Sequence, residues 1–407
     1  MSVRARHGDR TPSPAAASAS PPARGWSYWG LLAAALLVPW LIVGTIRTIA
    51  PVPHVGYDLE LLGRAATRLV DGLPVYLDAS GASFYPGSLD LYYGPPAYLL
   101  PWLPLAHLPG DLLQRLAYPL GVIEVAAALA LLVRAERDAL RPAQVAAIVA
   151  GAAGCWVVFA GVTLGASSTL TLLFVAGSWF YLRRGADVPG GIVLGTIIAW
   201  RVYPVALILP LLVARRWRAA GAAIATSVAW TAAGALVVGQ GAWSYPSLLL
   251  HLNGLDLPGT ASPAALAAYL LGPGPLITAI RVASIAIGAA LLVVGGVVMR
   301  ATEARWRLTG WGLACAGCLL LPGVIWDHYL TLLLILAVGL VVGTGRAWPG
   351  LLPVGIVSTT LGGGIALLWM PVVAIGLLVR RSALPAQTLG LKRPGATRAL
   401  EATGLDD

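Results

Sequence analysis

The sequence contains few charged residues. Asp, Glu, Lys and Arg make up 11% of its 407 residues, whereas 58% are hydrophobic. So little charge excludes an ordinary soluble protein. The hydrophobic residues form unbroken blocks, many of them long enough to cross a hydrocarbon core of about 30 Å, as membrane-spanning α-helices do. The short alternating segments typical of a transmembrane β-barrel are missing. We therefore predict an all-α polytopic membrane protein.

Lysine is nearly absent as well. Lys392 is the only one, so the net charge of +10 comes from arginine. The arginines fall in short clusters between apolar blocks and do not form one basic stretch. This distribution is typical of cytoplasmic loops under the positive-inside rule, and it argues against a nucleic-acid partner.

Cysteine is scarce, and the familiar catalytic motifs are missing. Cys155, Cys315 and Cys318 lie inside apolar blocks. The last two have the C-x-x-C spacing but lack the βαβ context of a redox motif, so we interpret all three as packing residues. The sequence has no zinc-type His/Cys spacing, no Walker glycine loop and no nucleophile elbow. We expect neither a metal nor a cofactor.

The chain is predicted to form one membrane domain between two tails. Residues 1–25, rich in Arg, Pro, Ala and Ser, are expected to be a disordered cytoplasmic tail, and residues 382–407 a second one. The domain between them, residues 26–381, begins with a retained span over Trp29–Ile46. Its polar stretches 50–93 and 239–274 are predicted to be external loops.

The arginine clusters constrain the topology. All of them lie on the cytoplasmic side if the proline-rich stretch 92–110 does not cross the membrane and the block 190–213 is broken at Trp200–Pro204. The last block, 350–379, would then turn through Gly362–Gly364. This topology has about 11–12 spans with both termini inside.

An amphipathic helix is expected at Asp58–Val70, on the outer membrane surface. Glu60 and Arg64, four residues apart, are interpreted as a solvated ion pair. For Asp58, a role as the N-cap of this helix is an equally good alternative to a catalytic role.

Polar residues within or beside the membrane are the strongest functional signal, because each costs about 2.5–3.5 kcal/mol at a helix centre. In the predicted topology they gather on the outer side and indicate a site that opens outward. They are His54, Tyr57, Asp58, Glu60, Arg64, Tyr92, Tyr93, Arg201, Tyr203, His251, Asn253, Asp256, Trp326, Asp327 and His328.

Some of these residues have a structural alternative. Tyr92 and Tyr93 can anchor the chain at the membrane interface, and Asp327 can cap a helix. Arg201 interrupts an apolar block and needs an anionic partner, which favours a functional role. His328 has no evident structural duty.

Several short motifs occur together in a characteristic order. They are the Asp in the first external loop, DGLPVY at Asp71–Tyr76, YYGPP at Tyr92–Pro96, WRVYP at Trp200–Pro204 and WDHY at Trp326–Tyr329. In this order the chain, from its first span to its last, resembles the polyprenol-phosphate-mannose-dependent α-mannosyltransferases of glycosyltransferase family 87, in the GT-C superfamily. Two positions depart from the family's pattern: Gly165–Ala166 replaces a frequent Gly-Gln pair, and Tyr329 replaces a second His.

The resemblance implies a GT-C-like helical bundle in the cell membrane, with interfacial helices in the first external loop and a site facing the extracytoplasmic side. It implies transfer of a mannosyl or related residue, with inversion, from a polyprenyl-phosphate sugar to a glycolipid or glycan acceptor. Asp58 matches the family's catalytic Asp, Arg201 a basic residue before a Pro, and His328 a His in the family's late W-x-H segment.

The remaining residues would assist these three. Donor binding is assigned to Arg201, His328, Tyr93 and Tyr92. Supporting or acceptor-binding roles are assigned to Glu60, Arg64, Tyr57, His251, Asn253, Trp326 and Asp327.

The chemistry agrees with this distribution of residues. Inverting transfer needs one base on the acceptor hydroxyl, and a carboxylate can provide it. A lipid phosphate leaves as a stable anion and needs charge stabilisation more than a proton, which Arg201 can supply. The main alternative is a transporter or lipid flippase, which often shows two similar halves with matched broken helices. No such repeat is visible in the sequence.

Overall fold

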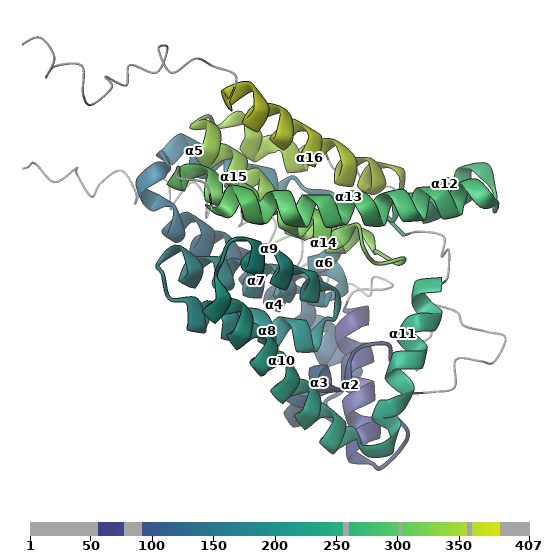
Figure 1. The fold of residues 1–407 in the computed structure, drawn as a ribbon. Coiled ribbons are helices and arrows are strands. Elements are labelled where there is room, and N and C mark those ends of the chain that lie inside the picture. The colour runs from purple at the N-terminus through teal and green to yellow at the C-terminus, as the bar shows by residue number, and fades with distance from the viewer. Residues whose placement is uncertain (1–55, 77–91, 255–259, 301–302, 356–359, 383–407) are drawn as a thin grey trace, which may run out of the picture.

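A computed structural model describes residues 56–76, 92–254, 260–300, 303–355 and 360–382. Within these ranges helices are the only extended regular elements, and Thr260 and Trp326 form one isolated antiparallel bridge. The prediction of an all-α protein is confirmed (Figure 1). The predicted first span Trp29–Ile46, most of both predicted tails, His54 and Asp256 lie outside the described residues.

The α-helices are α2 (Tyr57–Val70), α3 (Pro96–Leu99), α4 (Gly110–Ala135), α5 (Pro142–Ala153), α6 (Trp156–Leu164), α7 (Ser167–Arg183), α8 (Asp187–Trp200), α9 (Ile208–Val213), α10 (Trp217–Val238), α11 (Ser244–Gly254), α12 (Pro263–Leu271), α13 (Pro275–Arg300), α14 (Arg307–Leu319), α15 (Leu333–Thr344) and α16 (Thr360–Ser382). The 3-10 helices are η1 (Leu100–Leu105), η2 (Arg137–Ala139), η3 (Tyr203–Leu207), η4 (Gly239–Trp243), η5 (Ala304–Trp306), η6 (Asp327–Leu332) and η7 (Trp348–Gly355).

Several helices are long and apolar enough to cross a membrane. In the described part of the chain there are four: Gly110–Ala135, Trp217–Leu252, Pro275–Arg300 and Asp327–Thr344. A fifth span results if α5 and α6, which meet at a 58° bend, are taken together. The chain is therefore a polytopic membrane protein, and the total of 11–12 spans stays a prediction.

The predicted break in the block 190–213 is confirmed. Helix α8 ends at Trp200, Arg201 is extended with φ −147° and ψ 104°, and the chain turns into η3 and α9. Pro204 lies in the first turn of η3, where its missing N–H costs no hydrogen bond. The break places the Arg201 side chain between two apolar helices.

One prediction about irregular segments needs correction. The hairpin through Gly362–Gly364 is wrong, because α16 is helical from Thr360 onward; glycine is common in membrane helices and does not by itself mark a turn. The stretch 239–274 contains η4, α11 and α12, and its place outside the membrane stays a prediction. The proline-rich stretch 92–110 forms only α3 and η1 before α4 begins, and these ten residues are too short to span a bilayer, in agreement with the prediction that this stretch does not cross.

Glycines allow two helices to approach closely. In α13 and α14, Gly288 faces Gly317 and Gly295 faces Gly310. A Cβ added to any of the four would lie 2.5–2.8 Å from the carbonyl oxygen of its partner, so no side chain fits at these contacts. Such contacts between small residues drive helix association in membranes, where hydrophobicity gives little preference.

A pair of stacked tryptophans joins the N-terminal and C-terminal parts of the helical bundle. Helices α8 and α10 pack side by side, as do α13 and α14 (Figure 1). Trp179 on α7 stacks with Trp311 on α14, with ring centres 6.4 Å apart. Trp311 is fully buried. This contact joins the helices that lead to Arg201 to those that lead to Trp326.

Helix α2 is amphipathic, as predicted, but protein covers its apolar face. Leu59 packs with Leu113 and Ala117 of α4, and the chain enters the helix through Gly56, whose N–H donates to Thr163 O at 2.8 Å. The apolar face therefore packs on protein, and the location of this helix at the outer membrane surface stays a prediction. The helix is long enough to bury seven residues against α4 and its neighbours, and protein provides the partner that the membrane was expected to provide.

Candidate functional site

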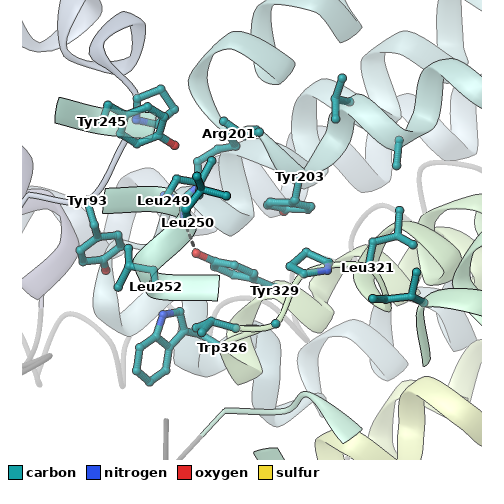
Figure 2. A pocket seen from close by; sticks show the side chains of 18 of the residues that line it. Tyr93, Arg201, Tyr203, Tyr245, Leu249, Leu250, Leu252, Leu321, Trp326 and Tyr329 are labelled. Atoms are coloured by element: carbon teal, nitrogen blue, oxygen red, sulfur yellow. Dashed lines mark hydrogen bonds between the residues drawn. The ribbon is translucent and has the colours of Figure 1, made fainter. Parts of the chain in front are cut away.

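A cavity of about 510 Å³ lies where the break after α8, helix α11, helix α13 and the segment before η6 meet. Most of its walls are apolar (Figure 2). The lining residues are Tyr57, Tyr93, Pro95, Arg201, Val202, Tyr203, Val205, Ala206, Tyr245, Leu249, Leu250, Leu252, Arg281, Ile285, Leu321, Pro322, Gly323, Val324, Trp326 and Tyr329.

Arg201 is the buried cation of this cavity, with 8% of the residue exposed. Its Nη2 donates a hydrogen bond to the Tyr329 hydroxyl at 3.0 Å, whereas its buried Nε has no hydrogen-bond partner (Figure 2). The guanidinium carbon lies 5.2 Å from the ring centre of Tyr329 and 5.9 Å from that of Tyr98.

Aromatic rings therefore surround the charge of Arg201, and within the described ranges no carboxylate lies within 4.0 Å of it. A buried cation without an anionic partner is unfavourable. It becomes favourable when an anion binds, which suits a site for an anionic ligand.

Asp58 lies beside the cavity, at the second residue of α2. It does not cap the helix, because Gly56 occupies the N-cap position in a left-handed conformation and no side chain caps it. The alternative role of Asp58 as an N-cap is thereby excluded. Its carboxylate is close enough to interact electrostatically with Arg201, Tyr93 and Tyr329. Burial raises the pKa of Asp58 to about 6, and the positive charge of Arg201 opposes this rise.

Because of this pKa, we expect kcat/KM to depend on pH. In the role predicted for Asp58, a base on the acceptor hydroxyl, the carboxylate must be deprotonated. The kcat/KM of the predicted sugar transfer should therefore fall as the pH drops through about 6, two units above the usual range of an aspartate. The measurement is kcat/KM between pH 4.5 and 8, with activity restored on return to neutral pH as the control for unfolding. A limb centred near pH 4 would show that Asp58 titrates as an ordinary exposed carboxyl group.

Four further predicted residues line the cavity: Tyr57, Tyr93, Tyr203 and Trp326. His328 and Tyr92, both assigned to donor binding, do not. The imidazole of His328 lies behind Tyr329, edge-to-face with ring centres 4.9 Å apart. Tyr92 is buried and its hydroxyl donates to Pro95 O at 2.9 Å. The structure thus places His328 and Tyr92 behind the wall, where they support Tyr329 and the turn at Pro95.

Glu60 and Arg64 pair as predicted, but only Arg64 is solvated. Glu60 is 6% exposed, and its Oε1 accepts from Arg64 Nη2 at 2.8 Å and Nε at 3.1 Å. Its other oxygen accepts from Gln114 Nε2 of α4 at 2.6 Å. The prediction of a solvated pair is wrong for Glu60, because it considered α2 alone. Glu60 fastens α2 to α4 and so holds the position of Asp58.

Of the remaining candidates, His251 and Asp327 do not line the cavity. His251 is exposed on α11, and the side chain of Asn253 lies outside the described residues. Asp327 is the first residue of η6, with Trp326 at the N-cap position, so it does not cap this helix. Its Oδ1 is buried without a hydrogen-bond partner.

Sequence reasoning missed three polar residues. Tyr329 binds Arg201 directly, although it was noted only as a departure from the family's pattern. Arg281 lines the cavity, and the available signal was a lone arginine within the apolar block 275–299. Glu124, in the middle of α4, accepts from Thr169 Oγ1 at 2.5 Å, and its signal was again a charge in an apolar block.

Metal and thiol chemistry find no support in the described part of the chain. There, no three His, Cys, Asp or Glu residues come together in an arrangement that could hold a metal ion. Cys155, Cys315 and Cys318 are free and buried, and Cys318 Sγ donates to Tyr203 O at 3.1 Å. Their interpretation as packing residues is confirmed.

The protein is a polytopic membrane protein with a buried arginine, a carboxylate beside it and apolar walls around one cavity, a combination that suits an anionic, largely apolar ligand. Residues 92–325, more than half of the 407-residue chain, match the model of glycosyltransferase family 87, and the chain belongs to this family. It is therefore a glycosyltransferase. No curated protein and no solved structure gives a significant match. The matched stretch contains Tyr93 and Arg201, whereas Asp58 and His328 lie outside it.

Proposed function

We propose that the protein transfers a mannosyl or related residue, with inversion, from a polyprenyl-phosphate sugar to a glycolipid or glycan acceptor. The reaction takes place on the extracytoplasmic face of the cell membrane. Asp58 acts as the general base on the acceptor hydroxyl, and Arg201 stabilises the phosphate that leaves. No metal takes part.

The observation that carries this proposal is the environment of Arg201. Its guanidinium is buried at a helix break, with an unpaired Nε and no carboxylate within 4.0 Å in the described ranges. A fixed, buried cation in a mostly apolar cavity suits a phosphate group attached to an apolar chain. A nucleoside diphosphate would bring a polar base and ribose into these walls, and burying such groups without hydrogen bonds is costly.

The rim of the cavity supports a lipid donor. Three residues that line it are also exposed apolar side chains: Val205 of η3, Leu250 of α11 and Ile285 of α13, with exposed fractions of 47%, 76% and 43%. In a membrane protein, such side chains face lipid. A prenyl chain can therefore pass between these three residues while its phosphate reaches Arg201.

The position of Asp58 supports its assigned role. With a pKa near 6 it is ionised at neutral pH, yet it is more basic than an exposed aspartate, as a general base should be. Asp58 and Arg201 are close enough to interact electrostatically, which supports a base and a phosphate-binding cation within one site. One base suffices because the leaving phosphate needs no general acid.

The test is transfer by the purified full-length protein from a panel of mannose donors. With mannosylated glycolipid and glycan acceptors, decaprenyl-phosphate-mannose is expected to give product and GDP-mannose none. The same assay with glucosyl and arabinosyl lipid donors identifies the sugar. Product from GDP-mannose alone would overturn the lipid donor, and transport of an intact lipid-linked sugar without transfer would favour a flippase.

A further inference from the structure

Arg281 is a charged residue within the membrane-spanning helix α13, and the proposed reaction assigns no role to it. It is the only charged residue between Pro275 and Met299. It lies six residues into the helix, about 9 Å along its axis. Ionisable residues within membrane spans are costly and usually serve substrate or ion pathways.

The cavity places this charge on the substrate side of α13. Arg281 lines the cavity of Arg201 and also a smaller cavity next to it, formed with Ser262 and Pro263 at the start of α12. Ile285, one helical turn further on, lines both cavities as well, and it belongs to the exposed apolar rim. Because residues four apart share a helix face, Arg281 lies next to this rim.

An arginine near a helix end can also extend to the membrane interface as an anchor. That role needs only a charge at a suitable depth. It does not require Arg281 to lie in the wall of the cavity that contains Arg201, half-buried among Ile285, Leu321 and Trp326. The position in the wall favours a ligand over an anchor.

We propose that Arg281 forms a second phosphate subsite, next to the rim of the cavity, for an amphiphilic substrate of this enzyme. The inference rests on the proposed lipid-phosphate donor. An anionic group that passes the rim between Leu250 and Ile285 loses water, and a guanidinium there replaces its hydration with charge-assisted hydrogen bonds. The phosphate belongs either to the donor on its way to Arg201 or to a phosphate-bearing lipid acceptor.

The experiment compares Arg281→Gln and Arg281→Lys with Arg300→Gln in the full-length protein. Arg300 is the matched control, because it lies exposed in the last turn of the same helix and does not line the cavity. The KM is measured separately for decaprenyl-phosphate-mannose and for glycolipid acceptors with and without a phosphate. Binding of decaprenyl phosphate and of neutral decaprenol is measured without turnover, in lipid nanodiscs.

In Arg281→Gln we expect one KM to rise about 10- to 100-fold while kcat changes less than about twofold, as for loss of a charged hydrogen bond made during binding. A rise in the donor KM assigns the subsite to the donor. A rise only for the phosphate-bearing acceptor assigns it to the acceptor. Arg281→Lys should recover part of the loss, and Arg300→Gln should match the wild type.

Unchanged KM values for both substrates in Arg281→Gln would overturn the subsite. That result leaves the proposed function intact if the wild type still binds decaprenyl phosphate more tightly than decaprenol. If the wild type binds both equally and transfers no sugar from the lipid donor, the proposed function itself fails, and the subsite with it.

Discussion

Replacing Asp58 by Asn is expected to abolish sugar transfer, with a loss of about 10²- to 10⁴-fold in kcat, the usual contribution of a positioned general base. Asn keeps the size of the side chain and can still accept hydrogen bonds, but it cannot take a proton from the acceptor hydroxyl. Because Asp58 makes no cap hydrogen bond in α2, the helix should remain intact. Transfer is measured with decaprenyl-phosphate-mannose at saturating acceptor.

The matched control is Asp71→Asn, at the other end of the same helix. Asp71 is half-exposed and lies 3.6 Å from His107, far from the cavity wall. The Asp71→Asn protein should transfer sugar at the wild-type rate. Full activity in a folded Asp58→Asn protein would remove Asp58 from the reaction, whereas loss of activity in both variants would indicate damage to α2.

Replacing Arg201 by Gln is expected to lower kcat by about 10²- to 10³-fold, the effect of removing one donor that stabilises developing charge. The leaving phosphate would then lose its buried counter-charge. Arg201→Lys should recover part of this loss, since it restores the charge but not the planar fork. The residual activity should also show a shifted pH dependence. Without the positive charge, the pKa of Asp58 should rise above 6 and the acid limb should move to higher pH.

Arg184→Gln is the control for the loss of a positive charge. Arg184 follows α7, and its guanidinium lies 3.5 Å from the ring centre of Phe180, outside the cavity. Its replacement should leave both kcat and the acid limb unchanged. An Arg201→Gln protein with normal kcat and a raised acceptor KM would instead assign Arg201 to the acceptor.

The sequence predicted the class of fold and the break at Arg201 because both depend on local patterns. Apolar blocks indicate helices. An arginine followed by Val-Tyr-Pro within such a block marks a break, because the proline would remove a backbone hydrogen bond and clash with the preceding turn of a continuous helix. The prediction of a hairpin at Gly362–Gly364 failed because glycine does not by itself end a helix within an apolar segment. The prediction of a solvated Glu60 failed because its partner, Gln114, is 54 residues away in the sequence.

The candidate site was predicted in part for the same reason. Arg201, Tyr93 and Trp326 were each conspicuous within their own segment, and the structure brings them to one cavity. Tyr329 was adjacent to a conspicuous residue, but only the packing of η6 against α7 and α15 turns it, and not His328, toward Arg201. The order of side chains around a short 3-10 helix depends on its neighbours, which no local pattern contains.

The glycine contacts of α13 and α14 have a mechanical consequence. Sliding one helix past the other would separate two backbone contacts at once, and no flexible side chain lies between them to absorb the shift. We therefore expect Arg281 on α13 and the segment after α14 that carries Trp326 to move together, as one rigid unit. Leu249 and Leu250 also line the cavity and belong to α11, which packs on the core through Tyr245 and Leu248 and not through paired glycines. Any change in the width of the cavity is therefore expected on the side of α11, where flexible side chains lie between the packed backbones.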